Sequence, residues 1–142
     1  VIGNTDGTTI YYEHETGTDQ VTPQATTTLT SSILSGDFDI TQDQREGITF
    51  KGDGEFIMRI SRIVPDFISQ TGNTVVELDV RNYPNDSAVS STLGPFTISS
   101  STDKIDTRAR GRAIALKISN TAASQSWKLG TFRLDVHPDG RR

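Results

Sequence analysis

The chain has 142 residues, which is enough for about one ordinary domain with a single core. It contains no cysteine, which excludes disulfides, thiolate catalysis and zinc sites built on sulfur. Its formal net charge of −4 argues against sequence-independent nucleic-acid binding, because such proteins need a positive excess to displace phosphate counterions.

The first segments of the chain are expected to lie outside the main domain. Residues 1–18 start without an initiating Met in a turn-like Gly-Asn-Thr-Asp-Gly stretch, so we expect the chain to be part of a longer protein and this segment to end a preceding β module. Residues 19–32 are nearly all Thr, Ser, Gln, Pro and Asp, without a periodic apolar face. This composition is typical of a linker, and the autonomous domain is therefore predicted to span residues 33–142.

Apolar and polar residues alternate through residues 33–142. Side chains of a strand project to its two faces in turn, so residues of one parity share a face. Six apolar sets share a parity: Leu34, Phe38 and Ile40; Phe56, Met58 and Ile60; Val76, Leu78 and Val80; Phe96 and Ile98; Ile114, Leu116 and Ile118; Phe132, Leu134 and Val136. The opposite parity is polar, which indicates antiparallel sheets packed face to face. We therefore expect an all-β antiparallel β-sandwich of about six to eight strands.

The alternation shifts phase at two places. Pro65 is expected to end one strand, since proline cannot donate to a sheet ladder. Trp127 and Leu129 have odd numbers whereas the next apolar residues have even ones, and Gly130 lies between them. A β-bulge at Gly130-Thr131 would let both sets face the core, which predicts a buried Trp127.

Candidate metal and catalytic residues lack a specific pattern. Neither His14 nor His137 belongs to a ligand-spaced motif. The carboxylates that could gather around a hard cation do not follow the order of a calcium loop, and they are Asp37, Asp39, Asp43, Asp53 and Glu55. No apolar run approaches the roughly twenty residues of a membrane-spanning helix. We expect no enzyme activity, no metal, no cofactor and no membrane partner.

One basic series stands out from this acidic chain. Arg108, Arg110 and Arg112 alternate, so an extended backbone would place their guanidinium groups in one line. Such a line can hold a phosphate backbone or the carboxylates of a neighbouring subunit. The simpler alternative is a cross-strand ladder with Glu77 or Asp79 in the same fold. We favour pairing with protein carboxylates over DNA contact, because the charge elsewhere is acidic.

The last third of the chain resembles a known virion protein family. The basic series in residues 106–112 leads into two strand patterns, at 113–119 and 127–136, and then into His-Pro-Asp-Gly-Arg-Arg at 137–142. This arrangement is similar to the carboxyl end of the tail nozzle proteins of short-tailed phages, also called packaged-DNA stabilisation proteins. These often close with a Trp-x-Leu-Gly strand and an Asp-Gly-Arg-Arg tail. Residues 7–17 also resemble the Gly-x-Ile-Tyr-x-His-Glu-x-Gly run of a late propeller strand in that family.

The resemblance implies a structural role in a phage tail, at the nozzle or the end of the tail tube, during DNA ejection. It implies a ring of identical subunits that touches other tail proteins such as the head–tail adaptor. Genomic DNA would pass through without sequence-specific binding. The protein would be located in the virion after synthesis in the host cytoplasm. The expected interface residues are Arg108, Arg110, Arg112, Asp139, Arg141 and Arg142.

A carbohydrate-binding β-sandwich of a tail protein is the alternative interpretation, because such domains bind glycans through exposed aromatic side chains and carboxylates. The candidate aromatic residues are Tyr11, Tyr12, Tyr83 and Trp127. Trp127 lies on the apolar parity of its strand, so its burial or exposure helps to separate the two interpretations. A hydrolase is a third and weaker hypothesis, since no Ser, His and Asp arrangement has an activating context.

Overall fold

A computed structural model describes residues 2–3, 9–10, 17–21, 25–43, 47–49, 54–83, 86 and 88–141. The regular elements of these residues are all strands, and none of the described segments forms a helix that could cross a membrane. In chain order the strands are β1 (Ile2–Gly3), β2 (Thr9–Ile10), β3 (Asp19–Val21), β4 (Thr26–Thr28), β5 (Ser32–Leu34), β6 (Thr41–Asp43), β7 (Gly47–Thr49), β8 (Met58–Val64), β9 (Phe67–Thr71), β10 (Thr74–Arg81), β11 (Ser91–Ile98), β12 (Ile105–Gly111), β13 (Ala113–Ser119), β14 (Ser126–Leu129) and β15 (Arg133–Pro138).

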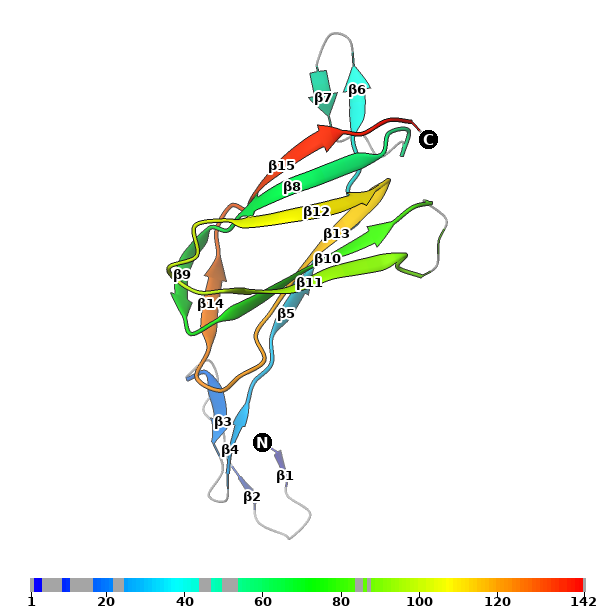
Figure 1. The fold of residues 1–142 in the computed structure, drawn as a ribbon. Helices are drawn as coiled ribbons and strands as arrows, with labels where there is room; N and C mark the ends of the chain where they lie inside the picture. Colours follow the sequence, from blue (N-terminus) through cyan, green and yellow to red (C-terminus); the bar gives the residue numbers. More distant parts are fainter. Residues whose placement is uncertain are drawn as a thin grey trace.

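Two antiparallel sheets form the body of the molecule (Figure 1). One has the strand order β11-β10-β13-β5 and the other has the order β12-β8-β15. A separate pair, β9 and β14, closes one end, while three short hairpins join β1 to β2, β3 to β4 and β6 to β7. The predicted all-β antiparallel sandwich is therefore confirmed, and the seven strands of the two main sheets lie within the expected number.

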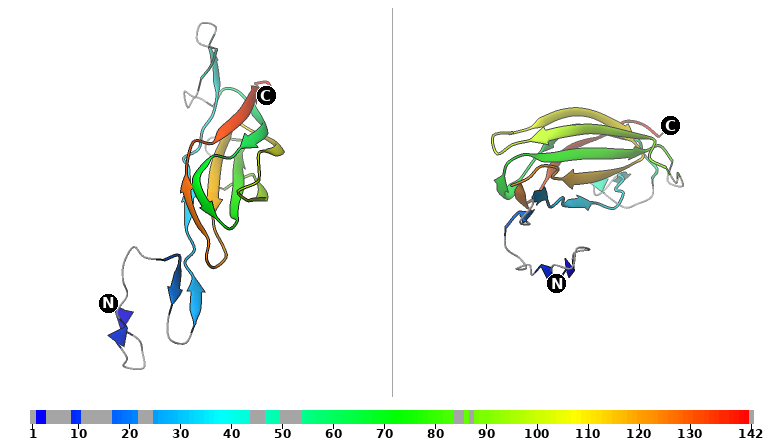
Figure 2. Two further views of the ribbon diagram at one scale, coloured as in Figure 1. Left: turned by 90° about the vertical axis from the view of Figure 1, so that its left-hand side faces the viewer. Right: turned by 90° about the horizontal axis from the view of Figure 1, so that it is seen from below.

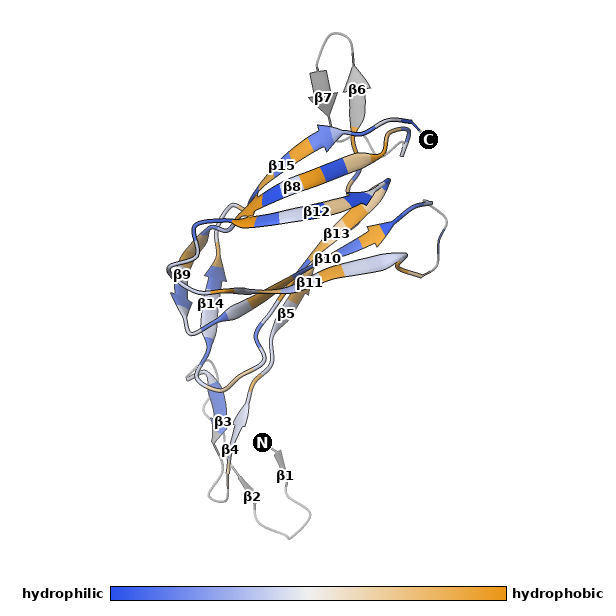
Figure 3. Ribbon diagram, viewed as in Figure 1, coloured by the Kyte–Doolittle hydropathy of each residue, from blue (hydrophilic) through white to orange (hydrophobic). Residues whose placement is uncertain are grey.

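The core lies between the two sheets and follows the predicted alternation. Along β10, buried and half-buried residues alternate without interruption, and orange and blue bands alternate along β8 and β10 in Figure 3. The buried cluster consists of Ile40, Phe56, Met58, Ile60, Ile63, Val76, Leu78, Val80, Ile98, Ala109, Ile114 and Ile118. Four of the six predicted apolar sets are buried in this cluster or packed against it, and in a fifth Ile98 is buried while Phe96 is only half-buried and lines a surface hollow. Burial of this apolar surface is the main term that stabilises the fold.

The clearest exception is Leu34 in the first predicted set. Phe38 packs against the core and Ile40 is buried, but Leu34 is 59 % exposed. Leu34 pairs with Lys117 of β13, whose side chain points to solvent, so Leu34 lies on the outer face of the sheet. The prediction that Leu34 faces the core is wrong, because Gly36 does not continue the strand and the parity is not carried across this break.

The two phase shifts lie at the same bend. There the chain passes from β8 to β9 and from β14 to β15, that is, between the three-stranded sheet and the pair of β9 and β14. The ladder of β8 and β15 ends where Pro65 ends β8, and the ladder of β9 and β14 begins just beyond it. At the bend the Gly130 amide donates to the Asp66 carbonyl oxygen over 2.8 Å. A Cβ on Gly130 would lie 2.8 Å from that oxygen, so only glycine allows this approach. The chain is thus interrupted between β14 and β15 rather than bulged within one strand.

Trp127 and Leu129 reach the core from this end of the sandwich. Both are half-buried and pack against the core cluster. Phe67 lies between two aromatic rings, with its centroid 6.3 Å from that of Trp127 and 5.5 Å from that of Phe132, both in edge-on geometry. The predicted packing of Trp127 is therefore confirmed, although the side chain is only partly buried.

The predicted linker contains a hairpin that is tied to the sandwich. β3 and β4 pair within residues 19–32 and extend away from the sheets (Figures 1 and 2). The Asp19 carboxylate accepts bonds from the amide and hydroxyl of Ser124, at 2.8 and 3.0 Å. The Asn120 side chain accepts from the amide and hydroxyl of Ser31, at 2.7 and 2.6 Å. Composition alone missed this hairpin because Thr-rich strands without apolar alternation look like linkers.

Candidate functional site

The carboxyl-terminal tail continues beyond β15 alongside residues 54–57, which precede β8. The Asp139 amide donates to the Ile57 carbonyl oxygen over 2.7 Å, and the Ile57 amide donates to the Gly140 carbonyl oxygen over 2.8 Å. Gly140 has a φ of 98°, a left-handed conformation that favours glycine. These bonds extend the pairing of β15 with β8 beyond Pro138, so the tail is held by the sheet to which it belongs.

Four of the predicted interface residues converge at this tail. Arg110 of β12 forms an ion pair with Asp139 through its Nε atom. Arg112 donates to three carbonyl oxygens, at 2.8 Å from Gly54, 3.0 Å from Glu55 and 3.0 Å from Arg141. This set is called the tail clasp below. A guanidinium group suits it, because its planar donors can reach several fixed acceptors at once.

Arg141 completes the tail clasp from the other side. Its Nη1 lies 3.3 Å from the Glu55 carboxylate, and its guanidinium carbon lies 4.7 Å from the centre of the Phe56 ring. The cation–π geometry places the charge over the face of a buried ring. Phe56 belongs to the core cluster, so the tail clasp couples the end of the chain to the core.

Of the other two predicted interface residues, Arg108 lies apart from the tail clasp. Arg108 is exposed on β12, where the register with β8 shifts between Asp106 and Ala109. It borders a hollow of about 370 Å³ that Leu93 and Phe96 of β11 also line. Arg142 lies outside the described residues.

The alternative of a ladder between the arginines and the carboxylates of β10 is wrong. Glu77 forms an ion pair with Lys117 over 2.8 Å, and this contact raises the pKa of the Lys117 ammonium group. Asp79 accepts a hydrogen bond from the Thr92 hydroxyl over 2.7 Å. The carboxylates lie on the four-stranded sheet and the arginines on the other, so they cannot face each other across one ladder.

A row of basic side chains crosses the outer face of the three-stranded sheet. Arg59 of β8 stands directly opposite Arg110 of β12 on one side and His137 of β15 on the other. All three side chains are exposed, and they are called the basic row below. Within the described part of the chain, Arg110 has the carboxylate of Asp139 and Arg59 has no ion pair. Arg59 and Arg110 carry like charges directly opposite each other, which disfavours a sheet, and of these two only Arg110 has a carboxylate partner among the described residues.

The next row on the same face is neutralised. Arg62 lies between Asp106 and Asp135, with its Nε 3.0 Å and its Nη1 3.6 Å from the two carboxylates. The hydrogen bond from Arg62 lowers the pKa of the Asp106 carboxyl, and the same bond raises the pKa of Arg62. The contrast with Arg59 lies in the neighbours, because Arg62 has an acidic residue opposite it on each flanking strand.

A hollow beside the tail clasp exposes an aromatic ring. Its volume is about 250 Å³ and it is lined by Ile57, Asn82, Tyr83, Arg110 and Arg112. Tyr83 is 66 % exposed. It is thus the described residue that best fits the aromatic platform of a glycan site, since Trp127 packs against the core and Tyr11 and Tyr12 lie outside the described residues.

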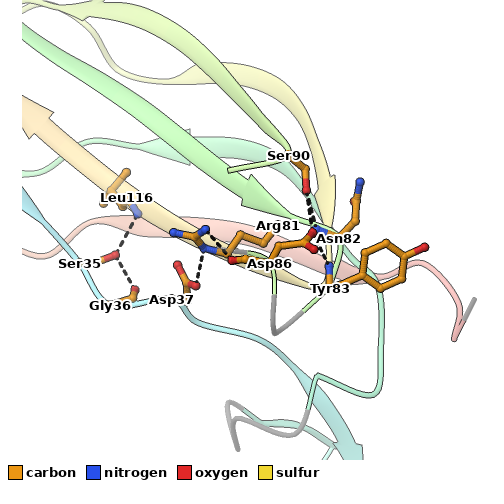
Figure 4. Close-up of polar contacts among 9 residues, drawn as sticks. All are labelled: Ser35, Gly36, Asp37, Arg81, Asn82, Tyr83, Asp86, Ser90 and Leu116. Atoms are coloured by element: carbon orange, nitrogen blue, oxygen red, sulfur yellow. Dashed lines mark hydrogen bonds and ion pairs between the residues drawn. The ribbon is translucent and has the colours of Figure 1, made fainter. Parts of the chain in front are cut away.

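The turn after β10 holds Tyr83 in place (Figure 4). The Tyr83 amide donates to the Asp86 carboxylate over 3.3 Å, and the Asn82 amide donates to the Ser90 hydroxyl oxygen over 3.0 Å. Arg81 spans this turn and the segment after β5, with bonds of 2.8 Å to the Asp37 carboxylate and 3.2 Å to the Asp86 carbonyl oxygen. Polar contacts therefore link the described residues on the two sides of this turn.

The acidic residues weighed as metal ligands are separated by other contacts. Asp37 is paired with Arg81, and Asp39 accepts the Gly54 amide over 2.7 Å. Among the described side chains, no three His, Cys, Asp or Glu residues gather as a metal site would require. His14 and Asp53 lie outside the described residues, and no side-chain placement is described for Asp43.

Sequence reasoning missed Arg59 and the carbonyl acceptors of residues 54–57. The position of Arg59 on a solvent face was readable, but its neighbours depend on the register of three strands. The carbonyl acceptors have no side-chain signature at all. Comparison with known proteins adds no assignment: no protein-family model matches the chain, and no curated protein matches it at a significant level.

Proposed function

We propose that the chain is a structural domain of a short-tailed phage tail, at the nozzle or the end of the tail tube, and that it acts by assembling with identical subunits. It would work without catalysis, contact other tail proteins such as the head–tail adaptor, and let genomic DNA pass without sequence-specific binding. The proposal starts from the resemblance of residues 7–17 and 106–142 to the nozzle family.

The basic row is the observation that supports assembly most directly. Arg59 stands between two basic side chains and has no ion pair within the described residues. The chain as a whole has 18 acidic and 14 Lys or Arg residues, so a second copy offers carboxylates in excess. Opposite charges across an interface steer association and fix its register. A neighbouring subunit is thus a fitting source of the missing negative charge.

Charge reversal of Arg59 tests this proposal. Arg59→Glu should weaken assembly into rings, measured by sedimentation velocity and negative-stain electron microscopy, while thermal melting shows that the fold persists. Lys128→Glu is the matched control, because Lys128 is also exposed and lacks an ion pair with any described residue. Assembly of Arg59→Glu equal to that of the wild type would refute the role of the basic row.

A DNA titration tests the other half of the proposal. Duplex DNA labelled with a fluorophore should show no binding at micromolar protein concentration and physiological salt, because the acidic chain supplies too little positive field. Micromolar binding that weakens steeply with salt and disappears on reversal of Arg59 and Arg108 would indicate a DNA-binding face instead.

The exposed Tyr83 supports glycan binding as the second candidate function. An aromatic face beside Asn82, Arg110 and Arg112 offers one stacking surface and several hydrogen-bond donors. A glycan array probed with the wild type and with Tyr83→Ala separates the two functions. Specific binding that is lost in Tyr83→Ala would favour the carbohydrate-binding module over the assembly domain.

A further inference from the structure

The four-stranded sheet has an open edge at β5. β5 is the last strand of this sheet, and none of the described strands pairs with its far side. The Ser35 amide and the Ser31 carbonyl bond to β13, at 2.9 and 3.0 Å. Alternate residues of an antiparallel strand bond to the same neighbour, so Ser32 and Leu34 direct their N–H and C=O groups to the open edge.

β5 is a short edge strand of three residues, but it lacks the other features that protect an edge strand from pairing. At the opposite edge of the same sheet, β11 carries Pro95, which has no N–H, and its register shifts opposite residues 76–78. Both features discourage further pairing. β5 has neither, and residues 20–36 contain no charged side chain. Ile33 is 47 % exposed and Leu34 is 59 % exposed, so the edge is also apolar.

We propose that a second copy of the chain pairs with this edge through its own β5, antiparallel about a twofold axis at Ile33. The free N–H and C=O groups of Ser32 in each copy would then bond to those of Leu34 in the other copy. This gives about four backbone hydrogen bonds. The two Ile33 side chains would face each other. In this register the free backbone groups of Ser32 and Leu34 meet those of the second copy.

The charge pattern favours a second copy over an unrelated partner. In a twofold contact, each residue near the axis meets itself or a close neighbour from the other copy, so a charged residue there would repel its own kind. Charged residues make up 23 % of the chain, yet the 17 residues of segment 20–36, which contains β5, include none. Ile33 pairs with Ile118 of the core cluster and shares its face, so the two Ile33 side chains would join the cores of both copies.

This inference goes beyond the proposed function and does not depend on it, because it uses only the edge of β5. The contact differs from the basic row in its chemistry. An apolar contact should tolerate high salt, whereas an interface of opposite charges should weaken. Reversal of Arg59 should leave the β5 contact intact, so failure of one proposal is distinguishable from failure of the other.

Cysteine cross-linking tests the register directly, because the chain has no native cysteine. Residues opposite each other outside the hydrogen-bonded pairs lie about 4.5 Å apart between Cα atoms, within the range of a disulfide. Ile33→Cys should therefore form a covalent dimer under mild oxidation. Leu34→Cys is the matched control, since its Cα would lie more than about 8 Å from its symmetry mate, too far for a disulfide.

Charge exchange tests the twofold axis without a covalent bond. Ile33→Lys alone and Ile33→Glu alone should each weaken dimerisation at least about tenfold in sedimentation velocity, because each places like charges on the axis. A mixture of the two variants should restore a dimer with one copy of each. The same pair of substitutions at Ile68 of β9, which is 65 % exposed, is the control and should change nothing.

The proposal is overturned if the wild-type chain stays monomeric at high micromolar concentration, or if Ile33→Cys and Leu34→Cys cross-link equally. Larger disordered aggregates in place of a discrete dimer would also overturn it, and would identify the edge as an aggregation site. A dimer that forms in the wild type but is untouched by both Ile33 variants would place the contact elsewhere, which equally rejects a β5 pair.

Discussion

Two replacements of Trp127 are expected to lower the stability by different amounts. Trp127→Ala removes a half-buried ring that packs against Phe67 and the core cluster. Full burial would make the loss about 3–5 kcal/mol, so we expect about 2–3 kcal/mol for this partly exposed position. The indole Nε1 is buried and has no hydrogen-bond partner among the described residues. Trp127→Phe therefore loses no hydrogen bond and should cost less than about 1 kcal/mol.

Urea unfolding followed by far-ultraviolet circular dichroism measures both variants. Tryptophan fluorescence cannot serve, because Trp127 is the only tryptophan. The slope of the free energy against urea should stay constant if only native packing changes. Lys128→Ala, at the neighbouring exposed residue, is the control and should change the stability by less than about 0.5 kcal/mol. A loss below about 1 kcal/mol in Trp127→Ala, or equal losses in both Trp127 variants, would refute the packing argument.

Four further predictions concern the tail clasp, the bend at Gly130, the pH dependence of unfolding and the requirement for a metal ion. Arg112→Ala should cost about 1–3 kcal/mol and speed hydrogen exchange in the tail, because three carbonyl oxygens lose a charged donor. Gly130→Ala should cost about 1–3 kcal/mol in the same unfolding assay, since its Cβ would press on the Asp66 carbonyl oxygen. The lowered pKa of Asp106 contributes stability that is present above its ordinary pKa of 3.8 and is lost as the pH falls through its lower folded-state value. Unfolding of Asp106→Asn should therefore depend less on pH below about 4 than unfolding of the wild type. Thermal melts with and without a chelator should coincide, and a large drop in the chelator sample would reveal a structural ion.

The sandwich could be predicted because its strands are long and covered on one face. Val76, Leu78 and Val80 alternate with polar residues in a strand that has neighbours on both sides, so parity and burial agree. Leu34 shows where this rule fails: a three-residue edge strand is covered on neither face, and parity carries no information there. The hairpin of β3 and β4 was missed for a related reason, since its strands have no apolar face to detect.

The residues of the candidate site were predicted better than their contacts. The sequence singled out Arg110, Arg112, Asp139 and Arg141, and the fold brings them together. Their partners could not be predicted, because the contact of Arg110 with Asp139 depends on the order of β12, β8 and β15 within one sheet. Alternation of arginines shows only that they share a face. Which charges share that face is decided by strand order and register.

Electron cryomicroscopy of an intact particle can locate this chain. We expect a ring of copies around the DNA channel of a phage tail, with the basic row of each copy against carboxylates of its neighbour. A position at a fibre tip, with Tyr83 facing outward and the basic row exposed, would refute assembly through the basic row and favour glycan binding. Absence of the chain from purified particles would reject the structural role altogether.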